Sequence, residues 1–107
     1  MLKRLDHVSI GVLDMEKATN LFTEILGGEP LPDKGASPSE GFDWVTFKLG
    51  GKKVELVTPH VHGDGGVGKY LEKYGEGFHH LSCAVDNLLE ARDYFEQKGI
   101  RVLGFDT

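Results

Sequence analysis

Three side chains of types that bind divalent metal ions are spread widely along this chain: His7, Glu55 and His80. Imidazole nitrogen and carboxylate oxygen together suit Co, Mn, Ni, Zn or Fe. The spacing carries no short-range metal signature, because the chain contains no HExxH or CxxC sequence. A shared site therefore requires a fold that brings these residues to one place.

An internal repeat predicts such a fold. Residues 6–12 read Asp-His-Val-Ser-Ile-Gly-Val, and residues 79–85 read His-His-Leu-Ser-Cys-Ala-Val, at an offset of 73 residues. The same offset relates an alanine and a phenylalanine further along each copy. Because an internal repeat usually means repeated architecture, His7 and His80 should occupy equivalent places in two copies of one unit.

The alternation of side chains in each copy predicts a strand. Within residues 5–12, His7 shares a face with small or polar residues, and apolar side chains occupy the other face. The second copy divides in the same way, with His80 on the small, polar face. By this parity, His79 and Cys83 point to the helix side, and Cys83 should fill the core.

A helix should follow each strand. Asp14 and Asn87 are suitable N-cap residues, and Gly27 and Gly99 should end the two helices. The apolar stripes of both helices need a surface to cover, and the apolar strand faces are the only comparable one. The histidine faces are therefore left open.

Further elements follow from local patterns. Two more strands are predicted at about 43–49 and 53–58, and Glu55 joins the histidine face if its apolar neighbours meet the helix. Residues 29–41 are expected to form an extended edge segment and loop. A connector follows, in which residues 67–74 could make a short helix.

Each candidate ligand also has a simpler interpretation. A strand histidine is usually a surface group or a satisfied core group, and Glu55 could be an exposed residue beside Lys52 and Lys53. His60 and His62 form an HxH pair on a loop that could bind metal adventitiously, although no third ligand is obvious beyond a nearby aspartate.

Composition restricts the class of protein. With 107 residues, 39% apolar and 27% charged, the chain fits one soluble domain. A formal charge of −5 with scattered basic residues disfavours a nucleic-acid surface. No apolar run approaches the roughly 20 residues that span a bilayer, and no signal peptide opens the sequence. We therefore expect a cytoplasmic protein with neither nucleic-acid nor membrane partners.

The chain resembles the vicinal oxygen chelate (glyoxalase/bleomycin resistance) superfamily. The resemblance lies in residues 6–12, in Val-Glu-Leu-Val at 54–57 and above all in Gly-Glu-Gly-Phe-His-His-Leu at 75–81. Within the superfamily, the run at 69–80 is most similar to the methylmalonyl-CoA epimerase family. The resemblance covers nearly the whole chain.

The resemblance implies an α+β fold in which tandem βαβββ modules form a curved mixed sheet with helices on the convex face. It divides a single domain, 1–107, into module 1 (about 1–60), a connector (about 61–77) and module 2 (about 78–107). Module 2 is then incomplete at its C-terminus, and the chain is expected to be a fragment or to receive the missing strands from another chain.

The superfamily's metal ligands match His7, Glu55 and His80. Its fourth ligand, a glutamate on the last strand of the second module, would lie near position 128, beyond Thr107. The resemblance also implies a divalent metal cofactor, an acyl-CoA substrate and a homodimer. It does not identify residues that contact coenzyme A.

The implied reaction is metal-dependent epimerisation of methylmalonyl-CoA through an enolate. The metal acts as a Lewis acid, and two acid/base groups work on opposite sides of C2. The missing fourth-ligand glutamate is one candidate for this work. Glu40, in a loop before the third strand, is the nearest match to the other; such a loop glutamate is otherwise usually just solvated.

Three alternatives remain at this point. One is a glyoxalase I-type isomerase (lactoylglutathione lyase) acting on a glutathione hemithioacetal. Another is an extradiol dioxygenase, but its carboxylate should lie in the second module. The third is a non-enzymatic resistance-type ligand-binding module, which both histidines disfavour and the absent fourth ligand favours.

Overall fold

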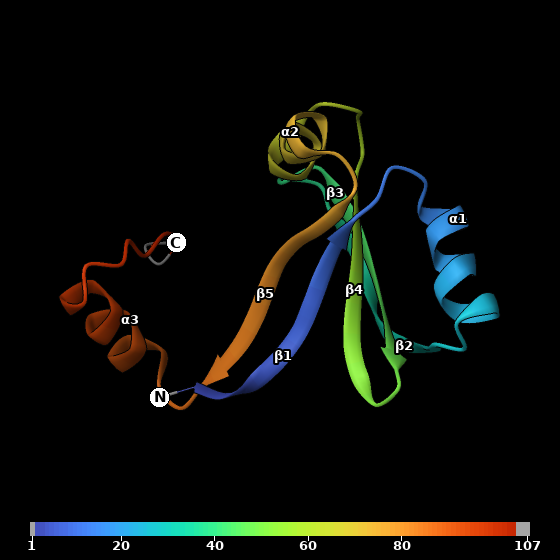
Figure 1. The fold of residues 1–107 in the computed structure, drawn as a ribbon. Coiled ribbons are helices and arrows are strands. Elements are labelled where there is room, and N and C mark those ends of the chain that lie inside the picture. The colour runs from blue at the N-terminus through green and yellow to red at the C-terminus, as the bar shows by residue number, and fades with distance from the viewer. Residues whose placement is uncertain (1, 105–107) are drawn as a thin grey trace. The chain divides into compact units, whose positions relative to one another are not determined.

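The computed structural model describes residues 2–104 and shows a mixed α+β fold (Figure 1). The five strands lie in one sheet in the order β2-β3-β4-β1-β5. β1 pairs with β4 in parallel, whereas β2, β3 and β4 pair in an antiparallel manner. The elements are β1 (Leu2–Gly11), α1 (Met15–Asn20), η1 (Leu21–Ile25), β2 (Glu29–Ser37), β3 (Phe42–Leu49), β4 (Lys52–Pro59), α2 (Gly65–Tyr74), β5 (Gly77–Val85) and α3 (Leu88–Gln97).

Two compact units make up the described chain. One contains residues 6–82, and the other contains residues 2–5 together with residues 83–104. The predicted strands, the edge segment and the connector helix are all present, with β2 at one end of the strand order. No helix among residues 2–104 is long and apolar enough to cross a membrane.

The first helix covers one face of the sheet in the larger unit. Asp14 caps α1 as predicted, since its Oδ1 accepts a hydrogen bond from the backbone N–H of Lys17 at 3.0 Å. Buried Phe47 and Leu56 lie beneath the helix. The ring of Phe22 packs on that of Phe47, with 5.1 Å between centroids. The apolar strand face therefore meets the helix.

The helix is less regular than predicted. After Asn20 it widens into the π-helical turn η1, in which the N–H of Leu26 donates to the carbonyl of Leu21, five residues back. Gly27 then ends the helical segment with a φ of 78°, a conformation that glycine adopts without strain.

The connector helix α2 packs on the opposite face of the same sheet. Val67 and Leu71 of α2 are buried against Val57 of β4. Gly11 of β1 makes room for this helix, because a Cβ there would lie 2.6 Å from Cδ2 of Leu71. The sequence indicated this helix but not which face of the sheet it covers. α2 covers one end of the sheet face that carries Glu55, whereas α1 covers the opposite face.

The smaller unit contains α3. Asn87 caps this helix as predicted, with its Oδ1 accepting from the N–H of Glu90 at 3.0 Å. Ala91 is its buried hydrophobic residue among those described. The prediction that Cys83 fills the core is wrong. Its side chain is exposed, in a hollow that it lines together with the apolar residues Val85 and Phe95.

Candidate functional site

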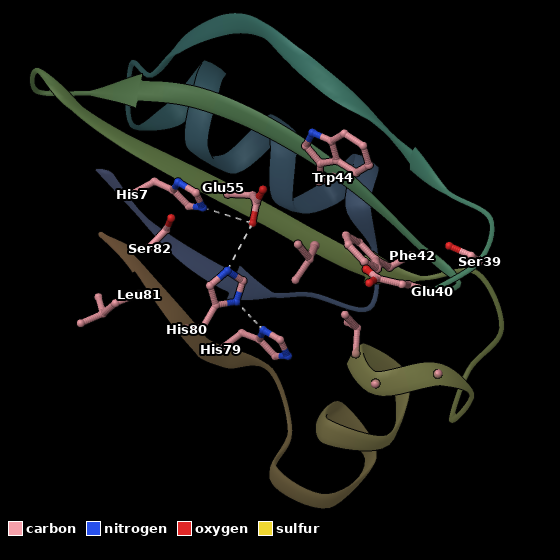
Figure 2. A pocket seen from close by; sticks show the side chains of 14 residues that line it. His7, Ser39, Glu40, Phe42, Trp44, Glu55, His79, His80, Leu81 and Ser82 are labelled. Atoms are coloured by element: carbon pink, nitrogen blue, oxygen red, sulfur yellow. Dashed lines mark hydrogen bonds and ion pairs between the residues drawn. The ribbon is translucent and has the colours of Figure 1, made fainter. Parts of the chain in front are cut away.

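The structure brings His7, Glu55 and His80 together from three adjacent strands (Figure 2). One potential ligand atom from each residue lies within 4.8 Å of the others. Nε2 of His7 is 3.6 Å from Oε1 of Glu55, and Nε2 of His80 is 3.8 Å from the same oxygen. Among the described residues, this is the group of three or more such side chains close enough to hold one metal ion.

Strand pairing explains why Glu55 faces the histidines. The parallel register of β1 and β4 places Glu55 opposite Ser9. Val54 and Leu56 pack into the core beneath α1, so Glu55 points to the other face of the sheet. Its side chain is only 15% exposed. Glu55 is therefore not a solvated strand residue paired with nearby lysines.

Ser9 links two of the three candidate ligands. It is fully buried, and its hydroxyl donates a hydrogen bond to Oε1 of Glu55 at 2.5 Å. The same Oγ lies 2.9 Å from Nε2 of His80. From the sequence alone, this position was distinguished only as one of the small, polar residues of its strand face. The signal was available in the repeat, because Ser82 stands at the equivalent position.

The outer ring nitrogens of both histidines also have partners. Nδ1 of His7 lies 2.8 Å from Oδ2 of Asp6. Nδ1 of His80 lies 2.7 Å from Nδ1 of His79. Each ring is therefore held from the side that faces away from Glu55. Sequence reasoning missed Asp6 as part of the site.

His79 does not point away from the site as strand parity predicted. It lines the cavity beside His80, and its ring meets the ring of Tyr70 edge-on at 4.7 Å between centroids. β5 is the last strand in the order of the described sheet, so the rings of neighbouring residues on this outer strand can turn toward each other. Burial lowers the pKa of His79, the nearby charge of His80 lowers it further, and Glu55 acts in the opposite direction.

The three candidate ligands line a cavity of about 850 Å³. This volume lies within the range of small-molecule sites. Its apolar wall includes Phe42, Trp44, Val57 and Val67. Glu40 also lines the cavity, and Figure 2 shows it beside Phe42. The arrangement can hold an apolar group next to a polar centre.

His60 and His62 lie elsewhere. Nε2 of His60 is 2.8 Å from Oδ1 of Asp43, and this pair belongs to no described three-residue metal cluster. His62 is exposed in the loop before α2. Among the described residues, this pair therefore forms no part of a candidate metal site.

Comparisons with known proteins agree with this geometry. Residues 6–106 match the model of the Glyoxalase/Bleomycin resistance protein/Dioxygenase superfamily. The mitochondrial methylmalonyl-CoA epimerase of Bos taurus is 37% identical over 95% of this chain and 58% of its own length. The ethylmalonyl-CoA/methylmalonyl-CoA epimerase of Cereibacter sphaeroides is 36% identical over 97% of this chain and 77% of its own length.

Solved structures show the same fold. A Streptomyces coelicolor methylmalonyl-CoA epimerase variant in complex with 2-nitronate-propionyl-CoA superposes with a TM-score of 0.86 and 26% identity. The match covers 97% of this chain and 75% of that one. The chain thus spans a little over half of the bovine relative and about three quarters of the two bacterial ones. This chain belongs to the glyoxalase/bleomycin resistance protein/dioxygenase superfamily.

Proposed function

We propose that the chain binds a divalent metal ion at His7, Glu55 and His80 and epimerises methylmalonyl-CoA at C2. The convergence of these three side chains on one cavity carries the proposal. Its support from outside the structure is the similarity to epimerases of methylmalonyl-CoA.

The donor set fits a metal ion of this class. Two imidazole nitrogens and one carboxylate oxygen suit Co, Mn, Ni, Zn or Fe. Nε2 of His7, Oε1 of Glu55 and Nε2 of His80 would hold it, since they already face one another. When bound, a divalent ion supplies Lewis-acid stabilisation of the negative charge that develops on oxygen as an enolate forms.

The cavity suits the acyl group of the proposed substrate. Phe42, Trp44, Val57 and Val67 give it an apolar wall that can receive the C2 methyl group and exclude water. The candidate ligand set carries one carboxylate, so a divalent ion leaves a local charge of about +1. This charge would attract the carboxylate of a malonyl group.

Glu40 is the proposed base that removes the proton from C2. Its side chain lines the same cavity as the candidate ligands. Its loop is tied to the end of β2, because the N–H of Gly41 donates to the carbonyl of Ser37 at 2.7 Å. A carboxylate placed beside the acyl pocket can accept a proton from carbon once the product enolate is stabilised.

Deuterium exchange tests the proposal directly. In heavy water, the metal-loaded protein should catalyse the incorporation of deuterium at C2 of methylmalonyl-CoA. ¹H NMR measures this as loss of the C2 proton signal. Glu40→Gln should slow exchange by about 10²- to 10⁴-fold, the usual contribution of a general base. Glu24→Gln, which removes an exposed carboxylate that does not line this cavity, is the matched control and should exchange normally.

Absence of exchange by the metal-loaded wild-type protein would refute the epimerase assignment. Turnover of a glutathione hemithioacetal under the same conditions would instead indicate a glyoxalase I-type isomerase. Ligand binding with neither reaction would indicate a resistance-type module. Exchange that survives Glu40→Gln would refute only the role given to Glu40.

We also propose that the protein acts as a cytoplasmic homodimer. The homodimer rests on the sequence resemblance, and the cytoplasmic location rests on the expectation drawn from composition. Light scattering coupled to size-exclusion chromatography tests the assembly, and a mass equal to a single chain would contradict it.

A further inference from the structure

In each of the two candidate ligand histidines, Nδ1 contacts the side chain of the preceding residue. Asp6 contacts Nδ1 of His7 at 2.8 Å, and His79 contacts Nδ1 of His80 at 2.7 Å. Asp6 and His79 stand at equivalent positions of the 73-residue repeat. The partner is therefore a feature of the repeated unit, although its chemistry differs between the copies.

We propose that His79 is a positioning residue that stabilises the tautomer and orientation in which Nε2 of His80 binds a metal ion. His79 does this by accepting a hydrogen bond at its Nδ1 from Nδ1–H of His80. The inference rests on the proposed metal site, but it concerns metal binding alone and requires no particular reaction.

Imidazole chemistry gives the direction of this hydrogen bond. A neutral imidazole carries one N–H, so a ring that coordinates through Nε2 must hold its proton on Nδ1. The atom facing Nδ1 of His80 is Nδ1 of His79, at 2.7 Å. His79 must then carry its own proton on Nε2 and offer the Nδ1 lone pair. A metal-bound histidine whose other N–H has a fixed acceptor is the usual arrangement.

The surroundings of His79 hold its ring in place. The ring of Tyr70, on α2, meets the His79 ring edge-on at 4.7 Å between centroids. The Tyr70 hydroxyl donates to the backbone carbonyl of Phe78 at 3.2 Å, and its ring also contacts that of Tyr74 at 4.8 Å. The acceptor that His80 uses is thus tied to a helix rather than to a loose surface side chain.

The opposite side of the His80 ring faces the candidate metal site. Nε2 of His80 lies 2.9 Å from Oγ of Ser9 and 3.8 Å from Oε1 of Glu55. Because the Ser9 hydroxyl donates to Glu55, its oxygen can only accept from Nε2–H of His80 while no metal ion is bound. A metal ion at Nε2 would take the place of this proton, and the ring would then carry its single proton on Nδ1, facing His79.

Three substitutions separate hydrogen bonding from packing. His79→Leu removes the acceptor and should weaken zinc binding by about 10- to 100-fold, the usual effect of losing such a partner. His79→Asn places its Oδ1 where Nδ1 stands and should restore most of the affinity. His79→Asp supplies the carboxylate that Asp6 already gives to His7, and it should bind zinc at least as tightly as the wild type. Competition with a chromophoric chelator measures all three.

A spectroscopic readout reports the bond itself. In ¹⁵N-histidine-labelled, zinc-loaded protein, an N–H···N hydrogen bond should give a scalar coupling between Nδ1 of His79 and Nδ1 of His80. The coupling should vanish in His79→Asn and His79→Leu. His62→Leu, which changes an exposed loop histidine, is the matched control for both measurements and should change neither.

The outcomes that overturn the inference are equally specific. Zinc affinity unchanged in His79→Leu would show that His80 needs no such partner. Equal losses in His79→Asn and His79→Leu would show that the ring matters only through packing. Neither measurement uses substrate, so failure of the deuterium exchange assay would leave this inference standing.

Discussion

The two copies of the opening strand place histidine at the same backbone position, but the two side chains differ in their exposure to solvent. His7 lies on β1, between β4 and β5, and its side chain is 14% exposed. His80 lies on β5 at the end of the sheet order, and its side chain is 44% exposed. Duplication therefore fixes the backbone position of each candidate ligand, whereas the position of its strand in the sheet decides how far its side chain is removed from water.

The partners of the two histidines differ in the same sense. The more buried His7 has a carboxylate on Nδ1, from Asp6, and the more exposed His80 has an imidazole, from His79. A carboxylate partner raises the basicity of a ligand histidine more than a neutral ring does. His7 should accordingly be the stronger of the two ligands.

Removing each histidine in turn gives the largest expected effect and tests this order. His7→Ala and His80→Ala should both lose stoichiometric metal, because a site with two remaining donors is incomplete. Residual binding should be weaker in His7→Ala. Elemental analysis after gel filtration measures the metal content, and titration with zinc ranks the variants.

The control for both is His62→Ala, which removes an exposed loop histidine and should keep the full metal content. Unchanged metal in both site variants would defeat the ligand assignment. Weaker binding by His80→Ala than by His7→Ala would reverse the proposed order of the two copies.

Asp6 provides the next effect in size. Asp6→Ala removes the carboxylate from Nδ1 of His7 and should weaken metal binding by about 10- to 100-fold. Asp6→Asn keeps an oxygen acceptor and should lose less. The measurement is the same zinc competition.

Lys53 supplies the control. Its Nζ lies 3.8 Å from Oδ2 of Asp6, so Asp6→Ala removes this ion pair as well as the contact with His7. Lys53→Met should bind metal nearly as well as the wild type. An equal loss in Lys53→Met and Asp6→Ala would assign the effect to the ion pair rather than to the histidine.

Much of this organisation could be predicted from sequence, because it follows from strict periodicity. Alternation on the strands places His7 and Glu55 on one face, and the repeat carries the same argument to His80. Caps at Asp14 and Asn87 follow from residue type alone, since each side chain bonds a free N–H of the first turn.

What sequence reasoning missed depends on tertiary surroundings. Strand alternation predicted that His79 points away from the site, but the side chains of an outer strand can depart from strict alternation. Cys83 was expected in the core because it stands where the first copy has Ile10, yet its side chain is exposed. Leu71 of α2 approaches Gly11 closely, whereas the second copy has Ala84 at the equivalent position.

The serines of the two copies give the smallest and most selective test. Ser9 is fully buried and donates to Glu55, while Ser82 at the equivalent position lines the open cavity and is only half-buried. Ser9→Ala should lower the free energy of unfolding by about 1 kcal/mol, the net value of a typical hydrogen bond. Ser82→Ala should change it by less than about 0.5 kcal/mol, as substitutions outside such contacts do.

Urea denaturation of the metal-free variants measures both changes without contribution from bound ions. Equal effects would mean that the two serines are as alike in energy as in sequence. A loss confined to Ser9→Ala would show that the repeat has specialised at this position, with the first copy fixing the carboxylate and the second leaving its face open to ligand.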